Sequence, residues 1–554
     1  MQEEVIISKD KNPINLDIKN IAKSPINVEF LKKELSYYQH PDKYILLKGF
    51  TEGFSLNYSG PHFYTEAKNL KSVNQQPQVV KQKINKEVSL RRVAGPFQNR
   101  PIYSLRVSPI GIVPKKEPGE YRLIHHLSHP SGQSLNDFID QKLCTVRYTQ
   151  FDEAVHMLQD LGKNCKIWKV DIKSAFRLLP VHPKDFDQLG YKFDSNYYID
   201  KCMPFGCSIS CSTFEKFACF LEFCMKRRMS SGKLLHYLDD YLGGDKSYDA
   251  SRMLMQNFVK LLMEMNVPMA DEKTVGPVSV LCFLGLELDS DEMVVRMPTD
   301  KIKEIIARIK LALTKEKVTL RFMQSLIGQL SFASRVIYPG RPFCRRLINA
   351  TCGLTKPFHH LRVNKAIKAD LRMWLTFFEN YNGISVFHDR FWVSNQDVQL
   401  YSDAAASLGF GSYFNGQWCY ALWPPEWRSS GLTSDITILE LFPIIVALHI
   451  WGAKLRNKKI VFFCDNQAVV HILNTMTSKS ERVMILVREA TMCCLKFNIA
   501  IKANYLEGKR NLICDSLSRM QIDRFRELAP EAEAQPQTIP SQLWTIFETG
   551  CQTF

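Results

Sequence analysis

The stretch that most constrains the fold sets two adjacent carboxylates, Asp239 and Asp240, between two short apolar runs at 234–238 and 241–244. These β-prone runs, the second closed by Gly-Gly, predict a tight hairpin with the acids at its tip. In a regular strand neighbouring side chains point to opposite faces, so only a turn lets both acids serve one site. Carboxylates held together repel each other unless a hard, oxygen-seeking cation such as Mg²⁺ neutralises them. Taken alone, the stretch also fits a polar surface turn, because Asp is a favoured turn residue.

The composition indicates a folded chain of several domains whose charge favours a polyanionic partner. A length of 554 residues corresponds to roughly three to five domains of ~100–200 residues, and 45% hydrophobic residues suffice for their cores. With 72 Lys and Arg against 56 Asp and Glu, the net charge is +16, which favours nucleic acid.

The cysteines and the apolar runs bear on the compartment. The 16 cysteines show neither a metal-binding pair of CxxC motifs nor a disulfide framework, which is typical of reduced core thiols. No secretory signal follows Met1, and the most apolar run, 436–451, is too short and too polar to span a bilayer. We therefore expect an intracellular protein, in the cytoplasm and/or nucleus, that does not enter a membrane.

The first chemistry along the chain is a basic hairpin near residues 104–124. Residues 1–90 carry no recognisable chemistry and are interpreted as an N-terminal extension whose polar stretch 71–86 is a linker. The alternating pattern that follows predicts a hairpin bearing Lys115, Lys116 and Arg122. Such cations can grip triphosphate oxygens, although a solvated basic hairpin gives the same pattern.

Two further motifs place polar groups at the ends of apolar elements. A β-run ends at Asp171 and is followed by Phe176 where the chain turns, although an isolated Asp after a strand is often a helix cap. Further on, a Pro-Phe-Gly turn containing Phe205 and Gly206 leads into a helix rich in small residues. A glycine there allows the backbone to approach a ligand closely.

In this order the motifs resemble those of the reverse transcriptases of retroelements. The resemblance runs through the fingers pair Lys116 and Arg122, the palm aspartate Asp171, the Pro-Phe-Gly turn and the Tyr-Leu-Asp-Asp box at 237–240. It continues with a lysine motif at Lys273 and a primer grip at 282–288, and extends over about 29–520. The phrases at 92–97, 123–137 and 327–343 resemble DIRS-type elements, retrotransposons that integrate with a tyrosine recombinase.

Nucleotide joining needs an in-line attack on a phosphorus, and two divalent ions about 3.5–4 Å apart stabilise the attacking and leaving oxygens. We assign Asp171 and Asp239 as the principal ligands and Asp240 as a supporting one, with two Mg²⁺ that Mn²⁺ can replace. Lys273 is expected to protonate or screen the departing pyrophosphate. By resemblance, Phe176 is the steric gate that selects deoxynucleotides, and Phe205 lies against the template base. A core aromatic is the alternative for Phe176.

Beyond the palm the pattern is helical. Apolar residues recur at helical spacing after 298 and again over 320–334, which predicts two helices. By resemblance this pair looks like the polymerase thumb, whose basic side is expected to follow a duplex backbone. A plain solvated basic face is the alternative. Residues 351–396 are interpreted as a short connection.

The C-terminal third holds four further acids. Asp403 ends a strand, Glu440 lies near the start of an apolar helix, Asp465 ends a buried strand and Asp515 begins a last helix. Singly, Glu440 with Thr437 could form only a capping box, and Asp515 could be a solvated helix residue.

The order of these four acids resembles that of ribonuclease H folds, which assemble four carboxylates over two metals to cut the RNA strand of an RNA/DNA hybrid. Related elements often have a His where this chain has Tyr505, so we expect slower product release or metal turnover. The tail from 521 onward is linker-like.

These motifs predict an α+β right-hand polymerase with fingers, a palm with an antiparallel sheet and a helical thumb, followed by an α/β ribonuclease H-like domain. The predicted boundaries are 1–90 extension and linker, 91–297 fingers and palm, 298–350 thumb, 351–396 connection, 397–520 ribonuclease H domain and 521–554 tail.

The expected function is that of an RNA-directed DNA polymerase of a retrotransposon that also degrades the RNA of the hybrid. Its expected partners are an RNA template, a DNA primer, the RNA/DNA hybrid and deoxynucleoside triphosphates. A recombinase and a capsid-like protein of the same element are candidate partners. Two alternatives remain open: a domesticated nucleic-acid-binding scaffold, and the polymerase of a reverse-transcribing DNA virus.

Overall fold

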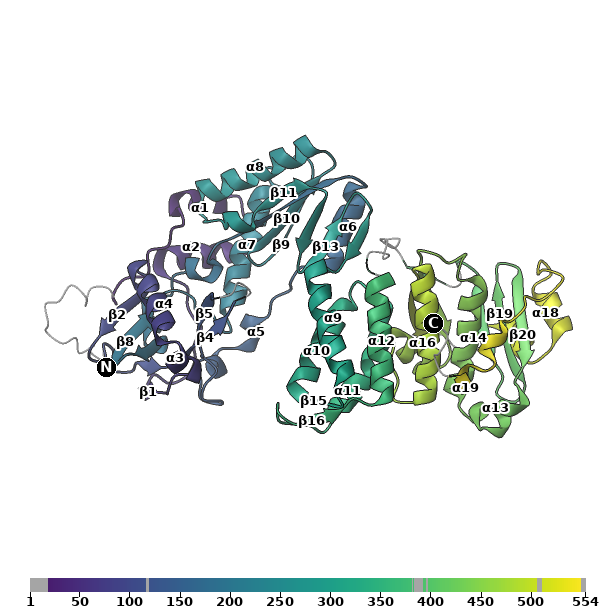
Figure 1. Cartoon of the computed structure of the whole chain (residues 1–554). Coiled ribbons are helices and arrows are strands. Elements are labelled where there is room, and N and C mark those ends of the chain that lie inside the picture. Colours follow the sequence, from purple (N-terminus) through teal and green to yellow (C-terminus); the bar gives the residue numbers. More distant parts are fainter. Residues whose placement is uncertain are drawn as a thin grey trace. The chain divides into compact units, whose positions relative to one another are not determined.

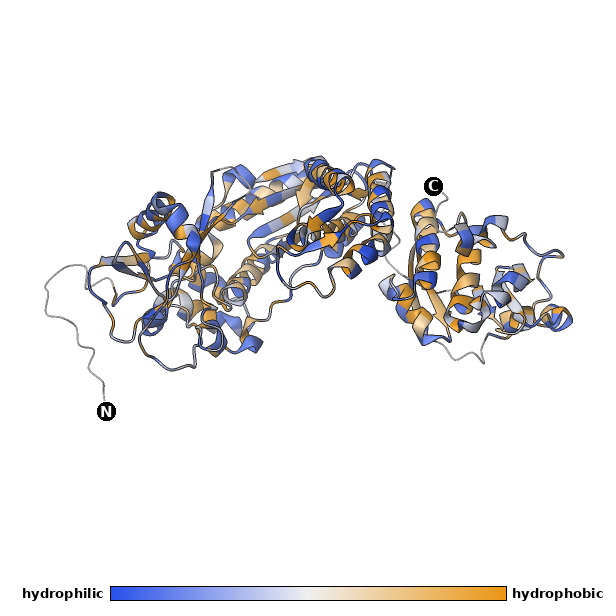
Figure 2. Cartoon of the chain, turned by 60° about the horizontal axis from the view of Figure 1, so that its bottom comes forward, coloured by the Kyte–Doolittle hydropathy of each residue, from blue (hydrophilic) through white to orange (hydrophobic). Residues whose placement is uncertain are grey.

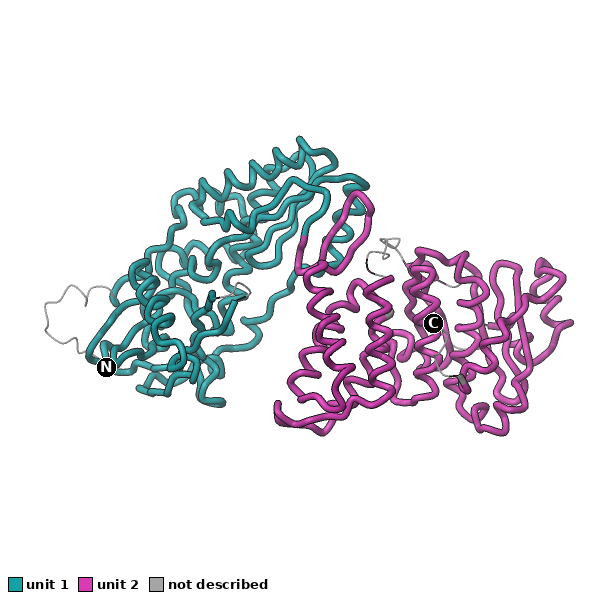
Figure 3. Tube along the Cα trace, viewed as in Figure 1, with its two compact units in different colours: residues 1–281 teal, residues 282–554 magenta. Residues whose placement is uncertain are grey.

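The computed structural model describes residues 18–115, 119–380, 382, 392–394, 397–505 and 511–549. The chain divides into two compact units, residues 1–281 and 282–554 (Figure 3). In both units many helices carry hydrophobic and hydrophilic residues on different sides, as expected where one face packs against a core (Figure 2). Among the described residues, no helix combines the length and the apolar character that a membrane span requires.

The centre of the first unit is a four-stranded antiparallel sheet, the palm sheet, in the order β11-β6-β10-β9 (Figure 1). Its strands are β6 (Lys166–Asp171), β9 (Lys233–Tyr237), β10 (Asp240–Asp245) and β11 (Val275–Val278). Two long helices, α7 (Ser210–Lys226) and α8 (Tyr248–Glu264), supply buried side chains to the core of this unit. Helices α1 (Val28–Leu35), α2 (Asp42–Glu52), α5 (Gln141–Cys144) and α6 (Phe151–Leu161) also precede the sheet in the chain.

Gly243 and Gly244 differ from their predicted place at the end of a run, because both lie inside β10. A Cβ on Gly243 would stand 2.2 Å from the ring of Trp168 on the neighbouring strand β6. Trp168 is fully buried, so the glycine makes room for the largest side chain of the sheet.

The fingers region contains a five-stranded sheet, β1-β3-β7-β8-β2, and a separate hairpin of β4 (Ile110–Pro114) and β5 (Tyr121–His125). The five strands are β1 (Thr65–Glu66), β2 (Val93–Phe97), β3 (Arg106–Val107), β7 (Gly190–Phe193) and β8 (Asn196–Asp200).

Residues 71–86, predicted as a linker, instead lie in helices α3 (Lys71–Gln75) and α4 (Pro77–Ser89). Val80 and Ile84 are one helical turn apart and are buried in a cluster with residues of the β4–β5 hairpin and of the five-stranded sheet. The polar composition concealed these few apolar contacts, which only the tertiary structure brings together.

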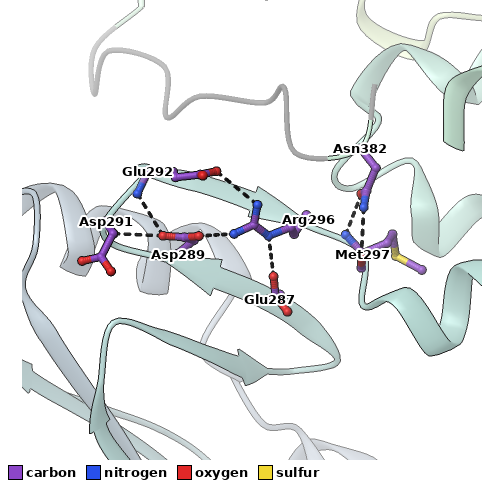
Figure 4. Close-up of polar contacts among 7 residues, drawn as sticks. All are labelled: Glu287, Asp289, Asp291, Glu292, Arg296, Met297 and Asn382. Carbon is purple, nitrogen blue, oxygen red and sulfur yellow. Dashed lines mark hydrogen bonds and ion pairs between the residues drawn. The ribbon is translucent and has the colours of Figure 1, made fainter. Parts of the chain in front are cut away.

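The second unit begins with a small sheet whose hairpin is held by one arginine. Strand β12 (Val280–Phe283) is followed by β13 (Leu286–Asp289) and β14 (Val294–Arg296). Figure 4 shows Arg296 reaching Glu287, Asp289 and Glu292, while Asn382 donates to the carbonyl oxygen of Met297 (3.1 Å) and accepts from its N–H (2.8 Å). The ion cluster thus cross-braces the β13–β14 hairpin, whose first strand overlaps the end of the predicted primer grip at 282–288.

Helices dominate the next part of this unit. They are α9 (Thr299–Thr314), α10 (Leu320–Ala333), α11 (Arg345–Thr351) and α12 (Lys365–Asn380), with a small β15–β16 pair at Lys317–Thr319 and His360–Arg362. Helix α12, within the predicted connection, is a core element: buried Asp370 pairs with Arg346 of α11 (3.1 Å) and with Arg488 of α16 (Glu481–Phe497; 3.3 Å).

The C-terminal part contains two three-stranded sheets with helices packed against them. One is antiparallel, formed by β18 (Leu400–Ala404), β19 (Gly409–Phe414) and β20 (Gln417–Leu422). The other is parallel, formed by β17 (Val393–Ser394), β21 (Lys459–Cys464) and β22 (Ala500–Tyr505). The helices of this part are α13 (Pro425–Ser429), α14 (Ile436–Trp451), α15 (Gln467–Thr475), α16 (Glu481–Phe497), α17 (Leu512–Ser518), α18 (Ile522–Leu528) and α19 (Ile546–Thr549).

The tail predicted to be linker-like is folded over 521–549. Phe525 packs on Trp418 with ring centroids 4.8 Å apart, and the indole N–H of Trp418 donates to the carbonyl of Glu533 (2.8 Å). Leu543 and Ile546 are buried in the core of the ribonuclease H-like part. A few aromatic and aliphatic anchors separated by Pro, Ala and Glu hold this segment, which its composition does not reveal. The boundaries of the predicted domains stay predictions.

Candidate active sites

A two-residue turn presents the first carboxylate centre, the palm site, formed by Asp171, Asp239 and Asp240. Strands β9 and β10 pair through Tyr237 and Asp240, which leaves Leu238 and Asp239 as the turn. Leu238 has a φ of 53°, in the left-handed region that a branched side chain rarely adopts. Asp171 lies directly opposite Asp240 across β6 and β10, and the carbonyl of Asp239 accepts from the N–H of Ile172 (2.9 Å). The turn therefore brings all three carboxylates to one end of the palm sheet.

Two lysines partly balance the charge of the palm site. Lys273 Nζ donates to both carboxylate oxygens of Asp171, each at 3.1 Å. Lys169 Nζ lies 3.9 Å from an oxygen of Asp240. The placement of Lys273 beside the first palm aspartate agrees with its predicted position at the site, and its role stays a prediction.

Burial and mutual repulsion raise the pKa values of Asp239 and Asp240. Burial, followed by the charge of Asp171, raises the pKa of Asp239. Burial also raises the pKa of Asp240 to about 6, with Asp171 and Asp239 adding to the rise and Lys169 opposing it. One buried oxygen of Asp240 has no hydrogen-bond partner among the described residues. Oxygen-only donors with this excess of negative charge fit hard divalent cations such as Mg²⁺.

A row of three side chains in contact connects the fingers hairpin with the palm. The guanidinium of Arg122 lies 4.8 Å from the ring centre of Phe205, and that ring lies 5.1 Å from the ring of Phe176. Lys115 pairs with Glu120 (3.5 Å) across the β4–β5 hairpin, whereas Lys116 lies outside the described residues. The structure therefore brings Arg122, Phe205 and Phe176 into one continuous contact.

Gly206 and Asn136 shape the Pro-Phe-Gly turn. Gly206 has a φ of 108°, and a Cβ there would lie 2.2 Å from the carbonyl oxygen of His125. Asn136 donates to the carbonyl of Gly206 (2.8 Å) and accepts from the N–H of Ser208 (2.9 Å). Asn136 was assigned no chemical role from the sequence. Its only signal was its place in the phrase 123–137.

The second carboxylate centre, the C-terminal site, gathers Asp403, Glu440, Asp465 and Asp515 from four elements. Asp403 lies in β18 and Glu440 in α14, Asp465 directly follows β21, and Asp515 lies in α17. Oxygens of Glu440 and Asp465 and the sulfur of Cys464 lie within 4.8 Å of one another. The cap of α14 is Asp435, which accepts from the N–H groups of Thr437 and Ile438, so Glu440 does not act in a capping box with Thr437.

The electrostatics of the C-terminal site are dominated by Glu440. Burial, followed by the charges of Asp403 and Asp465, raises the pKa of Glu440 to about 9. Burial also raises the pKa of Asp403, reinforced by Asp515 and Asp465 and opposed by the hydroxyl of Ser518, which donates to Asp403 (2.6 Å). The four carboxylates again form an oxygen-rich donor set that fits divalent cations.

Three residues of the C-terminal site were not singled out from the sequence. The hydroxyl of Ser518 donates a hydrogen bond to Asp403, and the guanidinium of Arg519 donates one to Asp515 (2.7 Å). Asn511 donates to the carbonyl of Ser402, next to Asp403 (2.8 Å). All three belong to the stretch around Asp515, so their proximity to that acid was the available signal.

Tyr505 ends strand β22 and pairs in register with Cys464, the residue before Asp465. Its side chain is exposed, and residues 506–510, which follow it, lie outside the described part of the chain. The position that relatives often fill with His therefore lies at the same strand ends as Asp465.

The two centres and the elements that carry them define an α+β right-hand polymerase fold followed by an α/β ribonuclease H-like domain, and the predicted fold class is confirmed. Residues 113–288 match the family model described as "Reverse transcriptase (RNA-dependent DNA polymerase)". This stretch, which contains the complete palm site, is a reverse transcriptase domain.

Curated relatives and solved structures give weaker likenesses. The genome polyproteins of Petunia vein clearing virus, isolates Shepherd and Hohn, are each 26% identical over 155 residues, which is 28% of this chain and 7% of the polyprotein. The matched stretch thus spans only a small part of these relatives. A foamy viral protease-reverse transcriptase in complex with double-stranded DNA is 13% identical with a TM-score of 0.49, covering 91% of this chain and 83% of that one. The foamy viral protein in complex with an RNA/DNA hybrid is 13% identical with a TM-score of 0.48, covering 98% of this chain and 66% of that one.

Proposed function

We propose that the chain is an RNA-directed DNA polymerase that copies RNA, and then DNA, into DNA, with a second centre that degrades RNA in the RNA/DNA hybrid. The observation that carries the proposal is the convergence of Asp171, Asp239 and Asp240 at one end of the palm sheet, with Lys273 bound to Asp171. A nucleic-acid scaffold has no need for one buried and two half-buried carboxylates that repel one another, because their desolvation costs free energy that binding does not recover.

In the palm site the proposed roles follow from placement. Asp171 and Asp239 hold two Mg²⁺, with Asp240 in support; when bound, these ions stabilise the attacking and leaving oxygens of nucleotidyl transfer, and Mn²⁺ can replace them. Lys273, already beside Asp171, donates a proton to the departing pyrophosphate or screens its charge. Lys115, Lys116 and Arg122 bind the triphosphate.

Two aromatic rings take part in selecting the nucleotide. The ring of Phe176 blocks a ribose 2′-hydroxyl and so selects deoxynucleotides. Phe205, held between Arg122 and Phe176, supports the template base. Gly206 lets the backbone of the Pro-Phe-Gly turn come close to the bound nucleotide.

In the C-terminal site Asp403, Glu440, Asp465 and Asp515 would hold two further divalent ions, whose chemistry when bound would be activation of water for cleavage of the RNA strand. Ser518 and Arg519 position Asp403 and Asp515. Because Tyr505 cannot act as the acid-base group that His supplies, we expect slower release of cleaved RNA from this site.

The proposed source is a DIRS-type retrotransposon, supported by the phrases at 92–97, 123–137 and 327–343. The enzyme would act inside the cell, in the cytoplasm and/or nucleus, on an RNA template, a DNA primer and deoxynucleoside triphosphates. The second candidate is the polymerase of a reverse-transcribing DNA virus, because viral polyproteins resemble part of this chain.

The decisive experiment is primer extension by the purified chain on a labelled RNA template with Mg²⁺ and deoxynucleotides, so that synthesis and RNA cleavage are read in one tube. We expect both activities in the wild type, and Asp239→Asn should abolish extension without preventing binding of the hybrid. Asn keeps the size of Asp and removes its charge, so the variant tests the carboxylate rather than the fold.

Tight hybrid binding with neither activity, across several templates and with both Mg²⁺ and Mn²⁺, would overturn the enzyme proposal in favour of a scaffold. Extension that persists in Asp239→Asn would show that the palm carboxylates are not the metal ligands.

A further inference from the structure

Three different metal-binding groups, none of them assigned to either carboxylate centre, meet between helix α7 and strand β9. Glu215 and Cys219 are four residues apart on α7, so they share one face of the helix. His236 projects from β9 toward them. Its Nε2 atom lies 3.3 Å from Glu215 Oε1 and 3.8 Å from Cys219 Sγ, and the sulfur lies 4.0 Å from the same carboxylate oxygen.

These separations come close to those of a tetrahedral zinc site. With bonds of about 2.0 Å to nitrogen and oxygen and about 2.3 Å to sulfur, the ligand atoms around Zn²⁺ lie roughly 3.3–3.6 Å apart. The nitrogen and oxygen already have this separation, and the sulfur would move inward by only a few tenths of an ångström.

A second carboxylate fixes the orientation of the histidine. Nδ1 of His236 bonds to Glu222, which is one helical turn beyond Cys219 on α7. When Nδ1 keeps the proton and donates it to Glu222, the lone pair of Nε2 faces Glu215 and Cys219. This carboxylate–histidine arrangement is the usual outer shell of histidine ligands to zinc.

Two further observations suit a bound cation. Glu215 Oε2 is buried and has no hydrogen-bond partner among the described residues. Cys219 is exposed, which leaves a route for an ion and a place for water as the fourth ligand. One carboxylate and one thiolate would balance the double charge of the ion.

We propose that Glu215, Cys219 and His236 bind one Zn²⁺ that joins α7 to β9, with Glu222 orienting the histidine. Thiolate and imidazole ligands favour Zn²⁺ over Mg²⁺, so this site differs in metal from the two carboxylate centres. Strand β9 leads directly into the turn that carries Asp239, and the ion would therefore hold that turn against the helix behind the palm sheet.

Another histidine–cysteine cluster in the described residues is less suited to metal. Nε2 of His449 is already hydrogen-bonded to Glu489 (2.8 Å), and both Glu489 and Cys493 are buried. Cys464, beside Glu440 and Asp465, belongs to the C-terminal carboxylate site. These two cysteines therefore serve as controls for the test.

The test uses Co²⁺ as a spectroscopic substitute for Zn²⁺ in the full chain, with excess Mg²⁺ present to occupy the carboxylate centres. We expect one equivalent of Co²⁺ to give a thiolate-to-cobalt charge-transfer band that Zn²⁺ abolishes by displacement. Cys219→Ser should remove the band, whereas Cys464→Ser and Cys493→Ser should keep it. Absence of the band, or its persistence in Cys219→Ser, would overturn the proposal.

A second measurement needs no variant. Stoichiometric Zn²⁺ should slow alkylation of Cys219 about tenfold, read by mass spectrometry, while the exposed Cys352 reacts at an unchanged rate. Equal alkylation of Cys219 with and without Zn²⁺ would instead indicate a metal-free cluster in which a protonated His236 bridges Glu215 and Glu222.

Discussion

The two carboxylate centres balance their charge in different ways. In the palm site Lys273 binds Asp171 and Lys169 lies near Asp240, whose pKa rises only to about 6. In the C-terminal site two described arginines, Arg519 and Arg524, both form ion pairs with Asp515.

Glu440 lies away from these arginines, among Asp403 and Asp465, and its pKa rises to about 9. The palm site is therefore partly neutralised by the protein itself, and the C-terminal site depends more strongly on protons or on added cations.

The largest expected effects separate the two centres. Asp171→Asn should reduce primer extension by at least ~10³-fold and leave RNA cleavage unchanged, because it removes a carboxylate on which the two-ion chemistry depends. Asp465→Asn should do the reverse. Both activities are measured on one labelled hybrid.

Loss of both activities in either variant would break this comparison, since it would mean one shared centre or a common fold defect. Hybrid binding by each variant, measured by fluorescence anisotropy, distinguishes those two causes.

The next effect tests Lys273, the cation that donates to the first aspartate of the palm site. Lys273→Ala should lower the rate of nucleotide incorporation about 10²-fold, because it removes both the proton donor and the partner of Asp171. Lys273→Arg keeps the charge but is a poor acid, so its rate of nucleotide incorporation should lie between those of the wild type and Lys273→Ala. Single-turnover kinetics across pH measure both variants.

Lys169→Ala is the matched control, because that lysine lies 3.9 Å from Asp240 and does not bind Asp171. If Lys169→Ala were as slow as Lys273→Ala, the lysines would act only through overall charge.

A smaller effect concerns stability without metal. The pKa of Glu440 rises from 4.5 when unfolded to about 9 when folded, so between these values the folded chain keeps a proton that the unfolded chain has released. Stability therefore falls as pH rises through this window. In EDTA, the melting temperature of the second unit should drop by about several degrees between pH 6 and pH 8.5.

Tryptophan fluorescence follows this unit, because every tryptophan except Trp168 lies after residue 281. Glu440→Gln should flatten the pH dependence of the melting temperature. In the wild-type chain, added Mg²⁺ should restore at high pH the stability that is lost in EDTA. A dependence that persists in Glu440→Gln would assign it to another group.

The smallest expected effect tests the departure at Tyr505. Tyr505→His should raise multiple-turnover RNA cleavage a few-fold, roughly the gain that one acid-base group adds to a step that is not chemistry. Extension should not change. The exposed position of Tyr505 makes a folding defect in this variant unexpected. A single-turnover rate that rises as much as the multiple-turnover rate would place the effect on cleavage rather than on release.

Local patterns predicted the elements that carry the acids. The strand ending at Asp171, the turn at Asp239 and the strand before Asp465 are all present, because strand and turn preferences act over a few residues. By contrast, stretch 71–86 and the tail from 521 were predicted as linkers and are folded.

By itself, therefore, the sequence determined the order of the carboxylates, the short elements that present them and the positive charge that suits a polyanion. Only the tertiary structure decided that Lys273 binds Asp171, that Ser518 holds Asp403 and that α7 and β9 bring Glu215, Cys219 and His236 together. The physical reason is range: backbone preferences are set by neighbours in the chain, whereas contacts across about 100 residues depend on how whole elements pack.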